Sequence, residues 1–360
     1  MVALLIYYLL IIAIFFINGI VFKVEDPFRK RKIFLLIICL LMILIQGLRS
    51  TGVGIDLLGH NSNTSTGYIN AFRYAKYYDF FSGEKLLNYE IGYSLYTKLF
   101  SIINVSDNVF LFIVSATVLI PIFIVWWKYS KYPMYSVLIY IALGFYTFSF
   151  SGLRQSIAIA IIVFSFKYVV TRKKYKFIVV VLIAMSFHKT ACFFFLAYPL
   201  YFIVFKRVHY LIIGLLYSLV FIFRRELFSF GYKLIFSQPV KSKVNDAYTM
   251  LLVMILVVIL ALLLGNRINA EPRFNAYKNY MLVAIFIQLF ASQSMLIMRL
   301  GYYYYVFISL LIPEVLSVWK NDKGVWIAKY ILILLLLFFY QKTTGSGYLN
   351  VSPYMFFWQG

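Results

Sequence analysis

The sequence predicts an all-α fold in which a polytopic bundle of helices crosses a membrane. Hydrophobic residues make up 63% of the chain and charged residues 13%, whereas a soluble domain carries about 25% charged residues. Runs such as 33–48, 109–127 and 248–264 contain almost only apolar residues, and a helix needs roughly 20 of these to cross the hydrocarbon core. Because the runs are continuous rather than alternating, they indicate helices and not barrel strands.

The apolar runs predict about 12 spans, with ten to thirteen as the range that the shorter runs allow. They lie at 2–22, 33–48, 108–127, 133–150, 155–171, 177–187, 190–205, 210–223, 249–265, 280–298, 302–319 and 329–341. The first run lacks a basic leader region and a small-residue cleavage site, so a retained helix is expected. Residues 1–360 are therefore read as a single integral-membrane domain. No P-loop, GxGxxG or CxxC motif indicates a soluble ATPase or redox unit.

The distribution of basic residues predicts the orientation of the helices. Most lysines and arginines fall in one alternating set of short breaks, which the positive-inside rule assigns to the cytoplasm. Two long loops, 49–107 and 224–248, and both termini then face the periplasm or outside. The first loop contains an amphipathic stretch at 93–103 that is expected at the membrane interface. Because the net charge of +22 lies beside the spans, it predicts contact with anionic lipid and not with nucleic acid.

The first candidate site segment, 49–56, directly follows the second predicted span. Gly52 and Gly54 allow a tight backbone whose amides can approach an anion. Arg49 at its start can hold a phosphate with a bidentate fork, and Asp56 at its end is a candidate base. A helix cap with an interfacial anchor is the equally weighted alternative for this segment.

A second candidate is Glu90, in the motif Glu-Ile-Gly-Tyr that precedes the amphipathic stretch. A carboxylate beside tyrosine and phenylalanine rings can have a raised pKa and act as a general base. An N-terminal helix cap is again the alternative with equal weight.

Three breaks between apolar runs carry cations at predicted membrane boundaries on the outer side. Arg154 lies in a break with almost no loop, and an arginine at this depth usually faces the bundle interior and meets a partner. His188 lies beside Lys189, and a histidine at a membrane exit can donate to an anion. Arg299 precedes a run of four tyrosines from Tyr302. These rings suit either an interfacial aromatic belt or stacking against sugars.

Taken in order, these pieces resemble the EpsG family of bacterial exopolysaccharide proteins, a branch of the Wzy-type O-antigen and capsule polymerases. The matching pieces are Arg49-x-x-x-Val-Gly-x-Asp56, Glu90-x-Gly-Tyr93, Leu153-Arg-Gln-x-x-Ala158, Phe187-His-Lys-Thr-Ala191 and Arg299-x-x-Tyr-Tyr303. They span about 49–305, which is most of the chain, and their order on one membrane face makes the set more specific than any single piece.

The resemblance implies a polymerase in the bacterial plasma (inner) membrane that acts on its outer face. Donor and acceptor are oligosaccharide repeat units linked to undecaprenyl diphosphate, and an acceptor hydroxyl attacks the anomeric carbon of the donor. The implied partners besides substrate are membrane lipid, a chain-length regulator and a flippase. No cofactor is expected, and because no DxD-type pair is present, metal-independent chemistry is predicted.

The resemblance also distributes roles among the candidate residues. The proton acceptor is one of Glu90, Asp56 and His188, and these three alternatives stay open. The diphosphate would be bound by cations, and the substrate channel would be lined by polar and aromatic side chains. The expected diphosphate-binding residues are Arg49, Arg154, Arg299 and Lys189; the expected lining residues are Gln155, Tyr93, Tyr302 and Tyr303.

Two other function classes compete with the polymerase. An O-antigen ligase or another lipid-linked sugar transferase would also need arginines near a diphosphate and one base. A lipid-linked oligosaccharide flippase should instead carry charges at several depths along a central path, often in repeat-related halves. The candidate site charges lie on one predicted face of the membrane, and no internal repeat is evident.

Overall fold

The computed structural model describes residues 4–58, 67–79, 89–236, 248–264, 271–317, 323–345 and 347–359. Within these ranges the regular secondary structure is helical, apart from an isolated bridge between Arg49 and Phe356. The predicted all-α fold is therefore confirmed.

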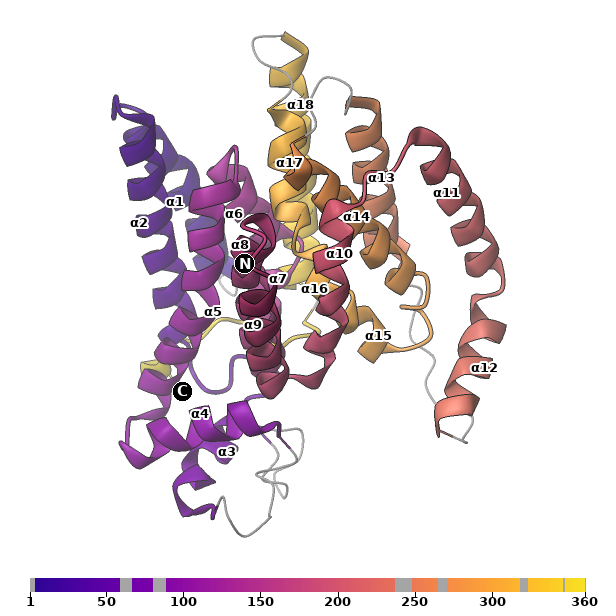
Figure 1. Ribbon diagram of the computed structural model, residues 1–360. Helices are drawn as coiled ribbons and strands as arrows, with labels where there is room; N and C mark the ends of the chain where they lie inside the picture. The colour runs from indigo at the N-terminus through magenta and orange to yellow at the C-terminus, as the bar shows by residue number, and fades with distance from the viewer. Residues whose placement is uncertain are drawn as a thin grey trace.

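The long helices run roughly side by side (Figure 1). One group packs around α5 and α8: α1 (Leu5–Val21), α2 (Pro27–Gly47), α5 (Asp107–Tyr129), α8 (Leu153–Val170) and α9 (Lys174–Phe187). A second group completes the core: α6 (Pro133–Ala142), α10 (Ala197–Phe202), α13 (Tyr248–Leu264), α14 (Pro272–Gln288), α17 (Ile308–Leu316) and α18 (Lys323–Gly345). The helices α11 (Arg207–Ile222) and α12 (Arg224–Phe236) lie at the edge of the molecule (Figure 1).

Several helix ends explain where the expected spans differ from the observed helices. The expected span 133–150 is divided into α6 and the short α7 (Phe145–Phe148), because Gly144 adopts a positive φ of 83°. The expected span 280–298 begins earlier, at Pro272, which takes the first helical position where its missing N–H has no cost. It also ends earlier, at Gln288, and α15 (Met295–Leu300) follows as a separate helix.

By length and composition, three helices in the described part of the chain could each cross a membrane: Asp107–Tyr129, Leu153–Val170 and Ile327–Gly345. A fourth candidate is the pair Leu296–Tyr305 and Ile308–Leu316, which is bent by 41° and includes α16 (Tyr302–Tyr305). Shorter apolar helices include α1, α6, α11 and α13. The chain is thus a helical membrane protein, whereas about 12 spans and outward-facing termini stay predictions.

The long loop expected at 49–107 contains the short helices α3 (Tyr68–Tyr74), η2 (Ala75–Tyr77) and α4 (Ile91–Ile102) in its described parts. Helix α4 turns a polar and aromatic face inward, burying Tyr93, Thr97 and Ser101. Its outward face is apolar, and Leu95 and Leu99 are 50% and 56% exposed. This arrangement is typical of a helix that lies at a membrane interface.

The C-terminal segment 347–359, which includes η6 (Phe357–Gln359), returns to the end of α2. The amide of Phe357 donates to the Leu48 carbonyl at 2.9 Å, and the amide of Gly54 donates to the Asn350 carbonyl at 2.9 Å. Gly54 has a φ of 121°, which a residue with a Cβ rarely adopts. The glycine-containing segment after α2 is thus fixed by the chain end.

Candidate functional site

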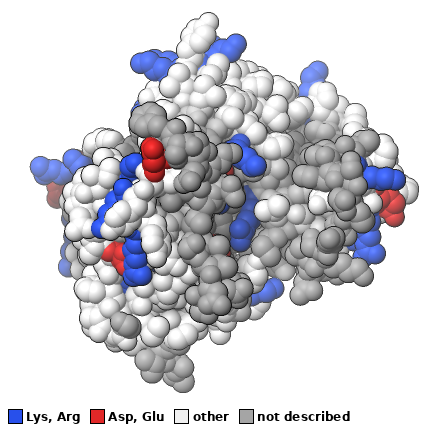
Figure 2. Space-filling view, turned by 90° about the horizontal axis from the view of Figure 1, so that it is seen from below, with Lys and Arg blue, Asp and Glu red and all other residues white. Residues whose placement is uncertain are grey.

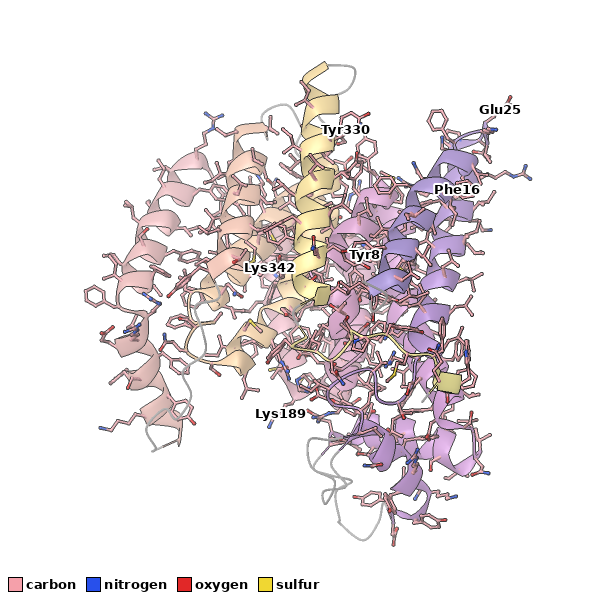
Figure 3. All side chains as sticks on the ribbon, turned by 180° about the vertical axis from the view of Figure 1, so that it is seen from behind. Tyr8, Phe16, Glu25, Lys189, Tyr330 and Lys342 are labelled. Atoms are coloured by element: carbon pink, nitrogen blue, oxygen red, sulfur yellow. The ribbon has the colours of Figure 1, made fainter. Side chains whose placement is uncertain are left out.

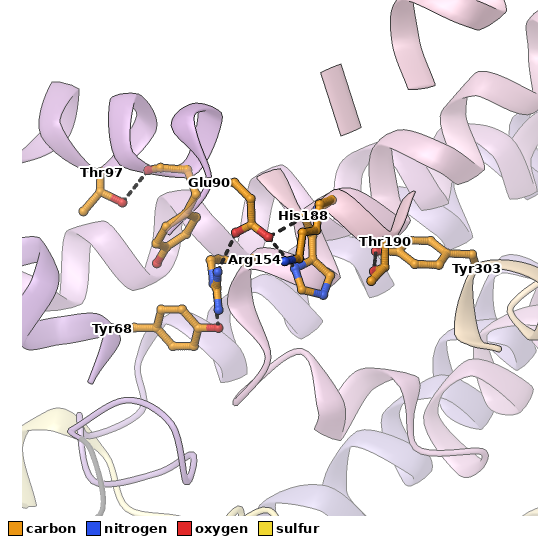
Figure 4. Close-up of polar contacts among 9 residues, drawn as sticks. Tyr68, Glu90, Thr97, Arg154, His188, Thr190 and Tyr303 are labelled. Atoms are coloured by element: carbon orange, nitrogen blue, oxygen red, sulfur yellow. Dashed lines mark hydrogen bonds and ion pairs between the residues drawn. The ribbon is translucent and has the colours of Figure 1, made fainter. Parts of the chain in front are cut away.

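Glu90 is the centre of a polar cluster between α4, α8 and α9 (Figure 4). One carboxylate oxygen, Oε2, accepts a hydrogen bond from Arg154 Nη1 at 2.5 Å. The other, Oε1, lies 3.1 Å from His188 Nδ1 and accepts from the Lys189 amide at 3.2 Å. Arg154 and His188 lie 64 and 98 residues from Glu90 in the sequence, and the Glu90 carboxylate joins them.

Helix ends place these three side chains together. Glu90 immediately precedes α4, Arg154 lies in the first turn of α8, and His188 follows the last residue of α9. His188 has the extended φ of −157°, which stops the helix and starts the 3₁₀ segment η4 (Lys189–Leu196). The break expected around His188 is thus a helix end that turns the imidazole toward Glu90.

A glycine allows α4 to approach α9 closely. A Cβ added to Gly92 would lie 2.8 Å from both the Cβ and the carbonyl oxygen of Ser186, and nearer still to its hydroxyl. Such distances are shorter than real Cβ contacts. The glycine in Glu-x-Gly-Tyr therefore has a packing reason, since it lets Glu90 reach His188, two residues beyond Ser186.

Two tyrosines frame the guanidinium of Arg154. Its carbon lies 4.3 Å from the ring centre of Tyr89, and Nε donates to the Tyr68 hydroxyl at 3.4 Å. The rings of Tyr68, Tyr89 and Tyr93 contact one another, with centroids 5.4–5.6 Å apart. Among the described residues Nη2 has no hydrogen-bond partner, and the Arg154 side chain is 22% exposed. One edge of this arginine can therefore meet a ligand.

The electrostatic surroundings keep Glu90 ionised. Burial by itself would raise the pKa of the Glu90 carboxyl. The hydrogen bond from His188, the positive charge of Arg154 and the backbone donors outweigh burial and lower this pKa to about 2. The raised pKa expected for a base among aromatic rings is therefore wrong for Glu90, because the charged partners dominate over desolvation.

The same geometry determines what the imidazole can do. An ionised carboxylate only accepts hydrogen bonds, so the contact at 3.1 Å requires the proton on His188 Nδ1. In the neutral ring Nε2 then carries a free lone pair, as in a histidine oriented by a carboxylate. The His188 side chain is 22% exposed. Of the three candidate bases, His188 has the arrangement best suited to accept a proton.

Two more cations lie near the cluster without a carboxylate partner in the described part of the chain. Gln155, next to Arg154, donates from Nε2 to the Arg299 carbonyl at 2.7 Å and so connects α8 with α15. The guanidinium of Arg299 lies 5.7 Å from the Phe148 ring and is partly exposed. Lys189 is exposed and lies at the end of the bundle opposite Glu25 (Figure 3). Both cations are available to an anionic ligand.

The remaining predicted residues lie around the cluster. Asp56 is partly exposed and acts electrostatically on Tyr68 and Tyr89, and its backbone carbonyl accepts from the Tyr68 amide at 3.1 Å. Tyr93 and Tyr303 are fully buried, and the Tyr303 hydroxyl lies 3.1 Å from Thr190 Oγ1. Because they are buried, they cannot line an open channel in this conformation. Tyr302 is partly exposed beside Phe148.

Arg49 lies apart from the Glu90 cluster. Its side chain is fully buried, and it donates to the carbonyls of Gln46 at 2.6 Å and Phe150 at 3.2 Å. Its guanidinium also lies 4.6 Å from the Phe150 ring. The Gly54 amide nearby is bonded to the C-terminal segment. Arg49 Nε is buried without a partner among the described residues, but the whole side chain is 0% exposed and its two Nη atoms are bonded to the backbone. The structure therefore indicates a structural role for this segment, with Arg49 closed to solvent and the Gly54 amide already bonded.

Seen from the side that carries α3 and α4, lysine and arginine side chains gather around a hollow in the surface (Figure 2). In the part of the chain that the structure describes, no group of three His, Cys, Asp or Glu side chains is arranged to hold a metal ion. The Glu90 cluster itself combines cations with one ionised carboxylate and one oriented histidine.

Comparison with protein-family models identifies the family to which the chain belongs. The EpsG family model matches residues 32–356. The chain belongs to the EpsG family. This membership supports a polysaccharide polymerase-like role in general terms and agrees with a helical membrane protein. No significant match to a curated protein or to a solved structure was found.

For this EpsG-family chain, the sequence motifs identify Glu90, Arg154 and His188 but not several residues that contact the site. Tyr68 and Tyr89, which frame Arg154, and Thr190, which contacts Tyr303, were not singled out. Thr190 lies two residues after His188 in the motif Phe-His-Lys-Thr-Ala, so the sequence could have indicated that Thr190 lies near the site. Tyr68 offered none, because it is one of 32 tyrosines.

Proposed function

We propose that this protein is a metal-independent polysaccharide polymerase that joins oligosaccharide repeat units linked to a polyprenyl diphosphate, undecaprenyl diphosphate in bacteria. The observation that carries the proposal is the Arg154–Glu90–His188 cluster, with Arg299 and Lys189 nearby. It combines an oriented proton acceptor with two cations, Arg299 and Lys189, that have no carboxylate partner in the described part of the chain. This glycosyl transfer needs both kinds of group. We further propose that the cluster faces the outside of the plasma membrane.

In the proposed reaction an acceptor hydroxyl oxygen forms a bond to the anomeric carbon of the donor chain. The hydroxyl proton passes to His188 Nε2, and Glu90 stabilises the resulting imidazolium at Nδ1. The bond from the anomeric carbon to the diphosphate oxygen breaks, and its electron pair leaves with the polyprenyl diphosphate. Because the donor carries its own activated leaving group, no nucleotide is consumed.

The cations act on the leaving group. The free edge of Arg154 and the side chains of Arg299 and Lys189 would bind the diphosphate and offset the negative charge that grows as the bond breaks. Glu90 is a positioning residue in this scheme. Three donors occupy its oxygens, and its lowered pKa makes it a poor base.

The test is reconstitution of the purified protein with a synthetic undecaprenyl-diphosphate-linked repeat unit, in EDTA, with products separated on a gel. A ladder at repeat-unit spacing is the expected result. A single transfer to a lipid A-type acceptor, without a ladder, would indicate a ligase instead. Transbilayer movement of the substrate without any new glycosidic bond would indicate a flippase.

A further inference from the structure

An apolar groove of about 630 Å³ lies between α11, α13 and α14, away from the Glu90 cluster. This volume is within the range of about 300–1,000 Å³ found for ligand-binding pockets. Its walls are almost entirely aliphatic and aromatic, and include Ile213, Ile255 and Leu289. On α11 the lining extends from Tyr210 to Ile222, which is roughly 18 Å at 1.5 Å per residue. The groove is therefore long and suits an extended hydrocarbon chain.

Helix α11 leaves this groove open because it packs loosely. None of its described residues is buried, and Leu211, Leu215 and Leu219 on it are 53–70% exposed. Gly214 adds to the opening, since a Cβ there would meet nothing within 4 Å. In a helix that is apolar on all sides, such exposure indicates lipid contact rather than a missing soluble partner.

One end of the groove carries an arginine whose hydrogen bonding is incomplete. Phe221 and Tyr248, which line that end, both contact Arg224: Nη1 donates to the Phe221 carbonyl at 2.6 Å and Nη2 donates to the Tyr248 hydroxyl at 2.7 Å. The third donor atom, Nε, is buried without a partner among the described residues. A buried N–H of a cation without an acceptor is costly, and phosphate oxygens are well suited to satisfy it.

The polar end of the groove also lies on the appropriate side of the molecule. Helix α11 ends where α12 begins, toward the side of the bundle on which α3 and α4 lie (Figure 1). The Glu90 cluster lies beside α4 on that same side. A lipid in the groove would thus present its phosphate at Arg224, at the end of α11 that points toward that side.

We infer that the groove between α11, α13 and α14 binds the isoprenoid chain of a polyprenyl diphosphate, with the diphosphate at Arg224. The inference rests on the proposed function for the identity of the lipid. It adds a lipid site at the edge of the bundle, where polyprenyl diphosphate can enter or leave sideways through the bilayer.

The test is direct binding of radiolabelled undecaprenyl diphosphate to the purified protein in nanodiscs of phosphatidylcholine. Gly214→Phe places a ring in the open part of the groove and should weaken binding at least tenfold, as should a second filling variant, Ser218→Phe. Gly19→Phe, on α1, is the matched control, because a Cβ there also meets nothing within 4 Å, and it should bind like the unmodified protein. Arg224→Ala should reduce the preference for undecaprenyl diphosphate over undecaprenol about tenfold.

Unchanged binding in both filling variants, at normal folded yield, would overturn the inference. So would displacement of the probe by phosphatidylglycerol at equal concentration, because that result would show an ordinary phospholipid site. Loss of binding in a variant counts only where the melting profile of that variant matches that of the Gly19→Phe control. The readout is independent of turnover: intact binding without a polymer ladder would contradict the proposed function alone, and a ladder with normal binding in both filling variants would contradict the groove alone.

Discussion

Replacing Gly92 with alanine tests whether the close contact of α4 and α9 maintains the site. Alanine normally favours a helix over glycine by about 1 kcal/mol. Here the added Cβ would lie 2.8 Å from the Ser186 carbonyl oxygen, whereas ordinary contact begins at 3.4 Å. Helix α4 must therefore move away by about 0.6 Å, and overpacking of this kind costs about 1–3 kcal/mol.

The displacement has a direct effect on the geometry of the proposed catalytic site. Moving Glu90 by about 0.6 Å stretches its 3.1 Å contact with His188 to about 3.7 Å, beyond hydrogen-bonding distance. Misplacement on this scale lowers enzymatic rates by up to about 10²-fold. We expect the initial rate of chain extension to fall about 10- to 100-fold in Gly92→Ala, with a lower melting temperature of the detergent-solubilised protein.

The controls separate this effect from a general response to alanine. Gly19→Ala, where a Cβ meets nothing within 4 Å, should leave rate and melting temperature unchanged. Adding Ser186→Gly to Gly92→Ala removes the Ser186 side chain but not its carbonyl, so it should restore the rate only in part. A Gly92→Ala protein with a rate within twofold of the unmodified protein would refute the reasoning.

Three further predictions concern single ionisable groups. Arg49→Ala should lower the free energy of unfolding by about 3 kcal/mol or prevent folding, since it removes charged hydrogen bonds to two buried carbonyls; thermal melting followed by size-exclusion chromatography measures this. Arg299→Ala should raise the KM for the lipid-linked donor about tenfold without changing the melting temperature, because its side chain makes no ion pair among the described residues. The Glu90 pKa, lowered from 4.5 to about 2, means that ionised Glu90 stabilises the fold fully above pH 4.5. That contribution, about 3 kcal/mol, is lost as the pH falls from 4.5 toward 2, which melting of Glu90→Gln beside the unmodified protein detects.

Each of these has a clear contrary result. Normal melting of Arg49→Ala with a raised KM would restore Arg49 to the diphosphate site. An unchanged KM in Arg299→Ala would remove Arg299 from it. A Glu90→Gln protein whose stability falls in parallel with the unmodified protein below pH 4.5 would contradict the lowered pKa.

Much of the fold and part of the site follow from the sequence because they depend on local patterns. Continuous apolar runs predict helices, and near-loopless polar breaks located Arg154 and His188. Both residues contact Glu90, because each stands at a helix end on the same side of the bundle. The motif Glu-x-Gly-Tyr identifies Glu90. The sequence does not show that Arg154 and His188 contact its carboxylate, so it predicts a raised pKa where the structure gives a lowered one.

The parts that could not be predicted depend on contacts between distant segments. Arg49 follows an apolar run just as Arg154 precedes one, so the sequence treats them alike. Arg49 is buried where Phe150 packs against its guanidinium and the chain end returns, with Phe357 bonded to Leu48. The observed helix ends also differ from the predicted span ends where a single residue breaks or starts a helix, as at Gly144 and Pro272.

The most direct test of the central claim is single-turnover transfer by His188→Gln, with binding of the lipid-linked donor measured in the same sample. Glutamine can still donate to Glu90 but cannot accept and hold the proton of the attacking hydroxyl. The account predicts a loss in the rate of glycosidic-bond formation of at least about 10²-fold with donor affinity unchanged. A rate within about tenfold of the unmodified protein would contradict His188 as the proton acceptor.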